Sequence, residues 1–343
     1  MPCSLAFGAQ SGFSRTALLS AVAVQEAWLP FSGSLQDARV GFFSANTVGG
    51  MDLSEAAFST LSGDKNAIDP EQFRYHECGA VTDLVANHFG FRDFTTTIST
   101  ACSSSANSIM MAAQMIQAGL IDAAIAGGAD ALCRFTLNGF NTLMILDRQP
   151  CQPFDNNRRG LNLGEGAGYL LLVSERLLHE KNIRPLGRVS GWANANDAYH
   201  QTASSPEGIG NTLAMQGALQ VAGLRPADIS YINLHGTGTA NNDSSEGKAI
   251  ESVFGAIVPP ASSTKAFTGH TLGAAAGVEA VFSMLSITES VVFPTLRWQT
   301  QMEDLAFAPV TTLLQNQDVH HVLSNSFGFG GTNSSLIVRK LIN

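Results

Sequence analysis

The chain has 343 residues, enough to bury a large core as one domain or as two fused halves. Hydrophobic residues make up 45% of it and charged residues 14%, which excludes a disordered chain. The formal net charge of −9 argues against nucleic acid as the main partner.

The N-terminal residues and the cysteines indicate a cytoplasmic protein. The first ten residues lack the basic start and the long apolar stretch of a signal peptide. Small or polar residues interrupt every apolar run, so we expect no membrane span. Five cysteines, none in a pair separated by two residues, favour a reducing compartment.

Apolar runs and helical periodicities alternate along the chain. Strands are predicted at residues 39–45, 94–99, 122–131, 169–174, 186–192, 229–234, 319–324 and 334–340. Helices are predicted at residues 81–89, 106–117, 175–181, 211–222, 243–254 and 275–290. This alternation is typical of an α/β protein whose helices cover largely parallel sheets. Pro185 is the best boundary between two halves, residues 1–185 and 186–343.

Cys102 follows a predicted strand and precedes a predicted apolar helix. Three serines, at 103–105, come directly after it. Its sulfur would lie at a helix N-terminus, where the helix dipole and free N–H groups favour a thiolate. Other nucleophiles use the same strand–turn–helix arrangement. We interpret the remaining cysteines as buried structural residues: Cys3, Cys78, Cys133 and Cys151.

Two histidines lie among similarly small residues. His235 ends a predicted strand and enters the loop Gly-Thr-Gly-Thr at 236–239, and His270 lies between Gly269 and a Thr-Leu-Gly segment. Taken singly, His235 could be a turn residue, while Lys265 and Glu246 could be solvated surface charges. One thiol and two imidazoles brought to a single point would instead indicate covalent acyl chemistry.

Residues 324–333 place two phenylalanines among three glycines. This pattern favours a backbone bent beside a ligand, with aromatic rings lining an apolar channel. A glycine-rich hairpin turn is the alternative. The glycine-rich stretch at 164–168 lacks the lysine and the spacing of nucleotide-binding loops, so a nucleotide site is not favoured.

Together these segments resemble the β-ketoacyl-acyl-carrier-protein synthases, the elongating condensing enzymes of the thiolase fold. The matching segments, which run from about residue 39 to the C-terminus, are 100–103, 153–155, 164–168, 235–239, 263–265, 269–273 and 325–331. Two histidines indicate the elongating type, because the initiating type has one histidine and an asparagine. The resemblance implies two similar βαβαβ halves in a layered α-β-α-β-α arrangement, with a shortened N-terminal half.

The resemblance also implies a decarboxylative condensation. Cys102 would take an acyl chain from the phosphopantetheine arm of an acyl carrier protein and form a thioester. His235 and His270 would assist decarboxylation of the malonyl carrier and stabilise the enolate. Lys265 and Glu246 would hold the histidines in place.

Further roles follow from the same resemblance. Thr237 and Thr239 would bind the pantetheine arm, and Phe327 and Phe329 would line the substrate channel, with Phe329 as a movable gate. The backbone N–H groups of Cys102 and Phe329 would form the oxyanion hole. Positions that hold a structural monovalent cation in some relatives match Asn233, Glu279, Ser324 and Asn325. No other cofactor is expected, since the substrates arrive on phosphopantetheine.

The expected partners are an acyl carrier protein and a second subunit, in a homodimer or a ketosynthase heterodimer. The relatives have a strand and helices where this chain has only residues 1–37, so candidates for carrier docking are few: Arg15, Lys65 and Arg134. Two alternatives stay open. The first is a non-catalytic partner subunit of the chain-length-factor type, and the second is a cysteine-dependent acyl hydrolase.

Overall fold

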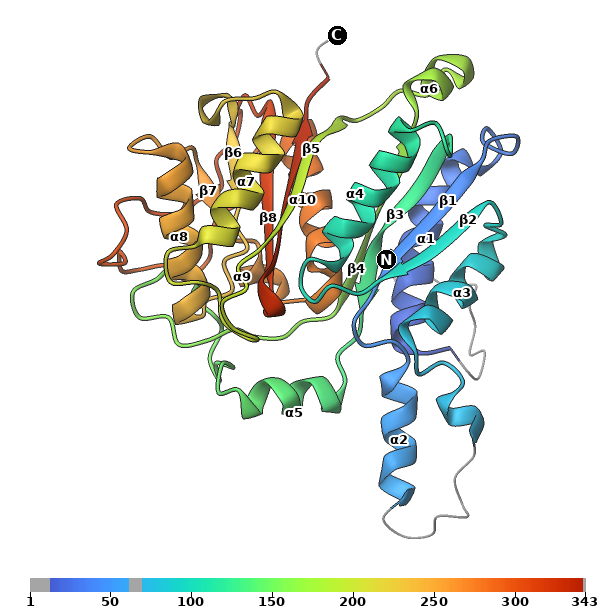
Figure 1. Ribbon diagram of the computed structural model, residues 1–343, viewed down its shortest axis with the longest axis horizontal. Helices are drawn as coiled ribbons and strands as arrows, with labels where there is room; N and C mark the ends of the chain where they lie inside the picture. Colours follow the sequence, from blue (N-terminus) through green and yellow to red (C-terminus); the bar gives the residue numbers. More distant parts are fainter. Residues whose placement is uncertain (1–12, 62–69, 342–343) are drawn as a thin grey trace.

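The computed structural model describes residues 13–61 and 70–341 (Figure 1). The first of its two sheets has the strand order β2-β1-β3-β4. Its strands are β1 (Val40–Ala45), β2 (Phe94–Ile98), β3 (Ala123–Asp130) and β4 (Gly166–Val173). Strand β1 runs parallel to both β2 and β3, whereas β4 runs antiparallel to β3.

The second sheet has the order β5-β9-β8-β6-β7. Its strands are β5 (Arg188–Asn196), β6 (Tyr231–Asn233), β7 (Ala261–Ser262), β8 (His321–Gly328) and β9 (Thr332–Arg339). The β6–β7 and β6–β8 pairs are parallel, and the β8–β9 and β5–β9 pairs are antiparallel. Both sheets are therefore mixed, and the prediction of largely parallel sheets is wrong at the three antiparallel pairs. Among the described residues the first sheet has four strands and the second has five.

Helices form three layers around the two sheets (Figure 1). The middle layer, α4 (Ser104–Gln117) and α10 (Ala275–Glu289), contacts strands of both sheets. Helices α1 (Arg15–Ser32) and α3 (Cys78–Phe89) pack on the first sheet, while α7 (Ile209–Ala222) packs on the second and against α8 (Ala240–Phe254). Helix α1 was not predicted. Apolar residues between the sheets, such as Phe43, Ile109, Ala276 and Leu336, join the two halves in one core cluster.

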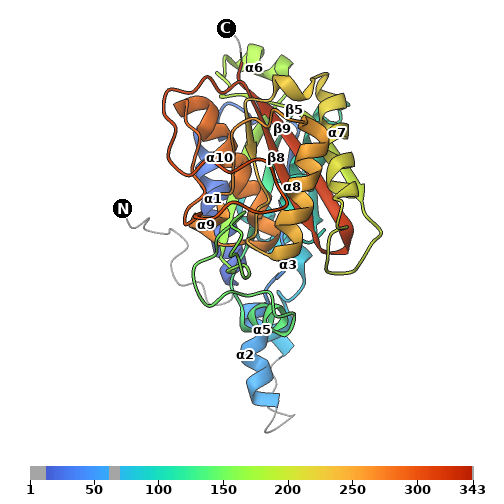
Figure 2. The same ribbon diagram turned by 90° about the vertical axis from the view of Figure 1, so that its left-hand side faces the viewer.

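Four shorter helices complete the described chain: α2 (Met51–Leu61), α5 (Arg134–Thr142), α6 (Glu175–Lys181) and α9 (Lys265–Thr268). Helices α2 and α5 project together from one end of the layered body (Figure 2). Helix α5 lies there without a single buried residue.

Helix α10 approaches β4 more closely than any side chain would permit. A Cβ atom built on Gly168 would lie 2.4 Å from the backbone carbon of Gly277. By length and composition the segment Leu272–Glu289 could cross a membrane, contrary to the expectation that no such run exists. However, 61% of the segment is buried, because it packs as a core helix between the sheets. The loop just before it carries His270.

Candidate active site

The turn that carries Cys102 connects β2 to α4. Ala101 has a φ of +52°, in the left-handed region, so the chain reverses sharply before the helix. The Ser103 hydroxyl donates to the Thr100 carbonyl at 2.8 Å, and the Ser104 hydroxyl donates to the Ala101 carbonyl at 2.5 Å. Hydrogen bonds from the serines therefore stabilise the turn. Cys102 itself is buried, with an exposed fraction of 7%.

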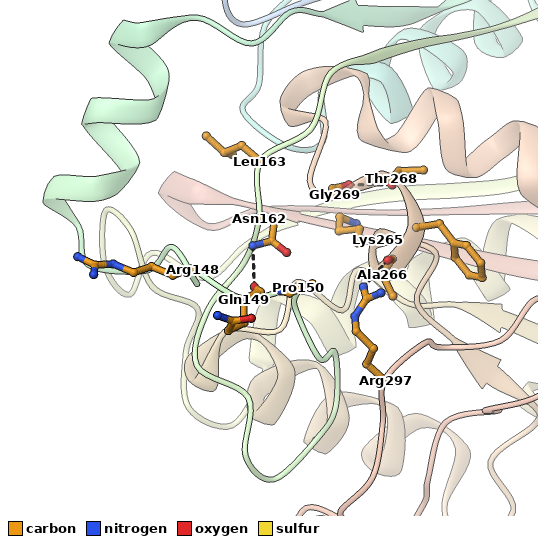
Figure 3. Close-up of a pocket in the computed structure, with 11 residues that line it drawn as sticks. Arg148, Gln149, Pro150, Asn162, Leu163, Lys265, Ala266, Thr268, Gly269 and Arg297 are labelled. Carbon is orange, nitrogen blue, oxygen red and sulfur yellow. Dashed lines mark hydrogen bonds between the residues drawn. The ribbon is translucent and has the colours of Figure 1, made fainter.

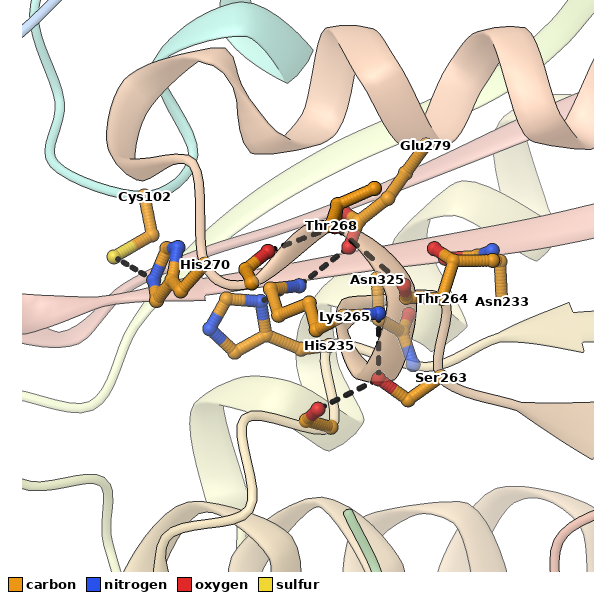
Figure 4. A network of polar contacts seen from close by, with 12 residues as sticks. Cys102, Asn233, His235, Ser263, Thr264, Lys265, Thr268, His270, Glu279 and Asn325 are labelled. Atoms are coloured by element: carbon orange, nitrogen blue, oxygen red, sulfur yellow. Dashed lines mark hydrogen bonds and ion pairs between the residues drawn. The ribbon is translucent and has the colours of Figure 1, made fainter. Parts of the chain in front are cut away.

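The structure brings the three predicted reactive side chains together (Figure 4). The Nε2 atom of His270 lies 3.0 Å from the Sγ atom of Cys102. The rings of His235 and His270 are nearly perpendicular, with their centroids 5.4 Å apart. The sulfur and one nitrogen of each ring all lie within 4.8 Å of one another. These residues come from distant segments, since Cys102 precedes α4, His235 follows β6 and His270 lies between α9 and α10.

Burial governs the charge of these groups. It raises the pKa of Cys102 to about 11, against the opposing effects of the Lys265 ammonium and the backbone N–H groups of Phe329 and Cys102. Burial also lowers the pKa of His270 to about 3 and the pKa of His235 well below its ordinary value. The expectation of a thiolate at Cys102 is therefore wrong for the resting state. Loss of hydration outweighs the helix N-terminus and leaves a thiol beside two neutral imidazoles.

A neutral imidazole carries one proton, and the contacts of both rings place it on Nε2. The Leu272 N–H donates to Nδ1 of His270 at 3.1 Å, so that nitrogen is an acceptor. Nδ1 of His235 lies 3.2 Å from Nζ of Lys265. Because Lys265 forms a buried ion pair with Glu279, its ammonium can only donate. Both rings therefore carry an Nε2–H group that can donate a hydrogen bond.

Two buried glutamates support this arrangement in different ways. Glu246 accepts the backbone N–H groups of His235 and Gly236, each at 2.8 Å, and thereby fixes the histidine loop. Glu279 is the ion-pair partner of Lys265, a role that the sequence analysis missed. A signal was available, because Glu279 is an acid inside the apolar helix α10, and a buried charge needs a partner.

The two predicted substrate-binding threonines lie at the entrance of α8. Thr237 is buried, and Thr239 is partly exposed. Their hydroxyls are 2.9 Å apart and hydrogen-bond to each other. Their predicted contact with a pantetheine arm stays a prediction.

The two predicted phenylalanines lie on either side of Gly328. The ring of Phe327 has its centroid 6.0 Å from that of His235. Phe329 stacks on Phe140 of α5, with ring centroids 5.7 Å apart. No sequence motif marks Phe140, because its importance comes only from the ring that it contacts.

A cavity of about 420 Å³ lies beside helix α9, which begins at Lys265 (Figure 3). Residues 265–269 form one wall, and Arg148 and Arg297 lie at its margins. Arg297 is held in place, since its guanidinium donates to the carbonyls of Cys151 and Ala266. Cys102 does not line this cavity, so the apolar channel expected at the thiol stays a prediction.

Two of the predicted cation ligands, Asn233 on β6 and Ser324 on β8, are paired across neighbouring strands. Buried side-chain oxygens of Asn233 and Glu279 have no hydrogen-bond partner among the described residues. The Asn325 amide donates to Glu246 at 3.2 Å, and its oxygen accepts the Ser335 hydroxyl at 2.8 Å. The predicted ligand Ser324 is buried one residue earlier on β8.

Of the three candidates for carrier docking, one forms an ion pair within the protein. Arg15 forms an ion pair with Glu165. Arg134 begins α5, and Lys65 lies outside the described residues. Arg15 is therefore not a free cation that an acidic carrier protein could contact.

Comparison with known proteins identifies the chain's relatives. Residues 13–177 match the beta-ketoacyl synthase N-terminal domain, and residues 186–299 match the C-terminal domain. The first match begins well before residue 39, so helix α1 belongs to the shared region. The 3-oxoacyl-acyl-carrier-protein synthase 2 of Staphylococcus aureus is 35% identical and covers 96% of this chain and 81% of that protein. The enzyme of the same name from Vibrio harveyi is 33% identical, over 89% of this chain and 76% of that protein.

Solved structures agree with the predicted thiolase fold. The ishigamide ketosynthase/chain length factor superposes with a TM-score of 0.90 at 29% identity, over 96% of this chain and 83% of that one. A ketosynthase in complex with its chain length factor, from Xenorhabdus doucetiae, gives a TM-score of 0.86 at 34% identity, over 96% and 82%. By sequence and by fold, the chain belongs to the beta-ketoacyl synthase family.

Proposed function

We propose that this protein is a 3-oxoacyl-acyl-carrier-protein synthase, which joins a carrier-bound acyl chain to a malonyl unit with loss of carbon dioxide. One observation carries the proposal. A buried thiol lies 3.0 Å from the Nε2 atom of His270, and a second imidazole, that of His235, faces the same point. A thiol supplies a nucleophile for acyl transfer, and two neutral N–H donors supply what a developing enolate needs.

The first step is acyl transfer to Cys102. The sulfur attacks the thioester carbonyl of the acyl carrier, the bond from carbon to the pantetheine sulfur breaks, and the thiol proton passes to the departing sulfur. No separate base is required, which suits a site where His270 Nε2 already holds a proton. The N–H groups of Cys102 and Phe329, which lower the pKa of the thiol, would bind the carbonyl oxygen as it gains charge.

The second step forms the carbon–carbon bond. The malonyl thioester loses carbon dioxide, and the two electrons of the broken bond form an enolate. His235 and His270 donate hydrogen bonds to the enolate oxygen through Nε2. The enolate carbon attacks the acyl thioester, the bond to Cys102 breaks, and the released thiolate takes a proton from solvent.

Two other functions compete with this one. A chain-length-factor-like subunit is favoured by the solved relatives that contain such a partner, one of which is a complex of the two proteins. The complete set of Cys102, His235 and His270 supports catalysis instead, because a subunit that only shapes a pocket has no need of it. An acyl hydrolase would require a water path to the thioester, and Cys102, His235 and His270 are all buried.

The proposal is tested by supplying an acyl carrier thioester and a malonyl carrier thioester together. We expect a 3-oxoacyl carrier product two carbons longer, with one carbon dioxide released for each product. Release of free fatty acid without a longer product would favour the hydrolase. No turnover alone but turnover with an added ketosynthase would favour the partner subunit.

His270→Ala is expected to separate the two steps. It still forms the acyl adduct on Cys102, because the thiol and the backbone donors are intact, but decarboxylation falls roughly 100- to 1,000-fold with the loss of one enolate donor. Intact-mass measurement follows the adduct, and carbon dioxide release from the malonyl carrier follows the second step. Unchanged carbon dioxide release would contradict the assigned role.

We also propose a monovalent cation at Asn233, Glu279, Ser324 and Asn325. The buried oxygens of Asn233 and Glu279 that lack hydrogen-bond partners fit such an ion, and it would neutralise carboxylate charge behind Lys265. The melting temperature is expected to rise by a few degrees when potassium or sodium chloride replaces choline chloride at equal ionic strength. An equal melting temperature in all three salts would argue against the site.

A further inference from the structure

Both backbone polar groups of Gly273, a residue between His270 and α10, are held by buried side chains that no step above uses. The Gly273 N–H donates to Oδ2 of Asp130 at 2.7 Å. The Gly273 carbonyl accepts the Ser105 hydroxyl at 2.6 Å, and the same hydroxyl oxygen accepts the Gly277 N–H at 2.8 Å. Asp130 is the last residue of β3, and Ser105 lies in the first turn of α4. Three structural elements thus meet at Gly273.

Asp130 is arranged purely as an acceptor. It is fully buried, and Oδ1 accepts the N–H groups of Thr47 at 2.8 Å and Val48 at 3.0 Å. Its Oδ2 accepts the Thr47 hydroxyl at 2.8 Å as well as the Gly273 N–H. Burial raises the pKa of Asp130 to about 6, which still leaves the carboxylate as the main form at pH 7.5. A buried carboxylate is costly unless hydrogen bonds compensate it, and four donors do so here.

The backbone of the residue before Gly273 is strained. Leu272 has a φ of +56°, which a residue with a branched side chain adopts rarely. In this conformation its N–H points at Nδ1 of His270, at 3.1 Å. Strain of this kind persists only where the surroundings hold the backbone in place. Here Asp130 holds the N–H group and Ser105 holds the carbonyl group of the next residue, Gly273.

We propose that Asp130, assisted by Ser105, is a positioning residue for the condensation. By clamping Gly273 it keeps the Leu272 N–H against Nδ1 of His270, and this contact keeps the proton of His270 on Nε2, facing Cys102. The proposal rests on the function proposed above, but the position of the proton can be observed without any turnover.

Asp130→Asn tests the clamp with almost no change in volume. The amide must turn its NH₂ group toward one of the two sets of donors that the carboxylate now accepts. The side facing Gly273 is the less unfavourable, because the Thr47 hydroxyl on that side can rotate and accept. On the other side both partners are N–H groups, which can only donate. The Gly273 N–H then loses its acceptor. The matched control is Asp122→Asn, at the residue just before the same strand begins, where the carboxylate pairs with Arg39 and Arg176.

Two measurements read out the result. Nitrogen-15 spectra of histidine-labelled protein, with the His270 signals assigned by their absence in His270→Ala, are expected to show only the Nε2–H form in wild type and in Asp122→Asn. In Asp130→Asn a mixture of the two tautomers is expected. Decarboxylation of the malonyl carrier should fall roughly 10- to 100-fold in Asp130→Asn, while the rate of acyl adduct formation changes less than about threefold.

Ser105→Ala keeps the carboxylate and removes only the second anchor, so it should shift the same two readouts in the same direction by a smaller amount. It also provides a folded variant if Asp130→Asn unfolds. An unchanged tautomer in both variants would overturn the proposal, as would an equal loss of decarboxylation in Asp122→Asn. If wild type shows the Nε2–H form but never condenses, the proposed function fails and the clamp stands.

Discussion

Cys102→Ala is expected to form no acyl adduct and to lose condensation by roughly four orders of magnitude or more, as when other enzymes lose their nucleophile. The reason is geometric. His270 and His235 are neutral donors with their protons on Nε2, so neither can replace sulfur as the atom that accepts the acyl group. Intact-mass measurement after incubation with an acyl carrier thioester detects the adduct directly, because the acyl group adds its own mass to the protein.

Cys133→Ala is the matched control for that experiment. Cys133 is buried like Cys102, but its sulfur accepts the Thr136 N–H at the start of α5, so it serves as a helix cap. The control should keep the full adduct. An equal adduct on Cys102→Ala and wild type would show that Cys102 is not the nucleophile. An adduct lost only in Cys133→Ala would identify Cys133 as the nucleophile.

Lys265→Met is expected to lower the free energy of unfolding by about 3–5 kcal/mol, the usual cost of removing one partner from a buried ion pair. Both partners are almost wholly buried, at 1% and 2% exposure, so the Glu279 carboxylate would be left without charge compensation or solvent. Urea unfolding measures the loss. Condensation should fall as well, because Nδ1 of His235 loses the ammonium that keeps its proton on Nε2.

Glu279 determines how the stability loss in Lys265→Met changes with pH. Burial raises the pKa of Glu279 and Lys265 opposes this, so removing the ammonium raises the pKa further. A raised carboxyl pKa in the folded state makes that state bind protons more readily, so stability falls as pH rises from the unfolded pKa to the folded one. The penalty in Lys265→Met is therefore expected to be smaller at pH 5 than at pH 8.

The double variant Lys265→Met/Glu279→Gln separates stability from chemistry. Without an unpaired carboxylate it should recover most of the lost unfolding free energy, yet stay inactive because His235 still lacks its donor. A double variant as unstable as the single one would show that the ion pair is not the source of the loss. Recovered activity would show that Lys265 does not act through His235.

Most strands and helices could be predicted from the sequence, because their periodicities are local. It failed where the answer depends on neighbours. An apolar run such as β4 does not disclose the direction of the strand beside it, so the mixed sheets were not foreseen. Helix α1 was missed although Ser14 caps it, its hydroxyl accepting the Ala17 N–H at 3.2 Å, and its apolar face joins the core cluster around Phe42.

The candidate site divides in the same manner. Cys102, His235 and His270 lie in small-residue motifs that mark them in the sequence. The ion-pair role of Glu279, the ring of Phe140 and the clamp at Asp130 had no such mark, since each becomes meaningful only when another segment arrives. The helix N-terminus alone does not determine the charge of Cys102, because the whole fold removes water from the sulfur and thereby raises the pKa of the thiol.

The tautomers of the two imidazoles have a consequence beyond condensation. A thiol and two histidines within 4.8 Å of one another have the donor atoms and spacing with which proteins chelate zinc. Chelation needs the lone pair of Nε2, and that lone pair is lost while the nitrogen bears hydrogen. To free it, the hydrogen would have to move to Nδ1, where the Leu272 N–H and the Lys265 ammonium already stand. While these contacts hold the hydrogens on Nε2, neither ring offers that lone pair to a zinc ion.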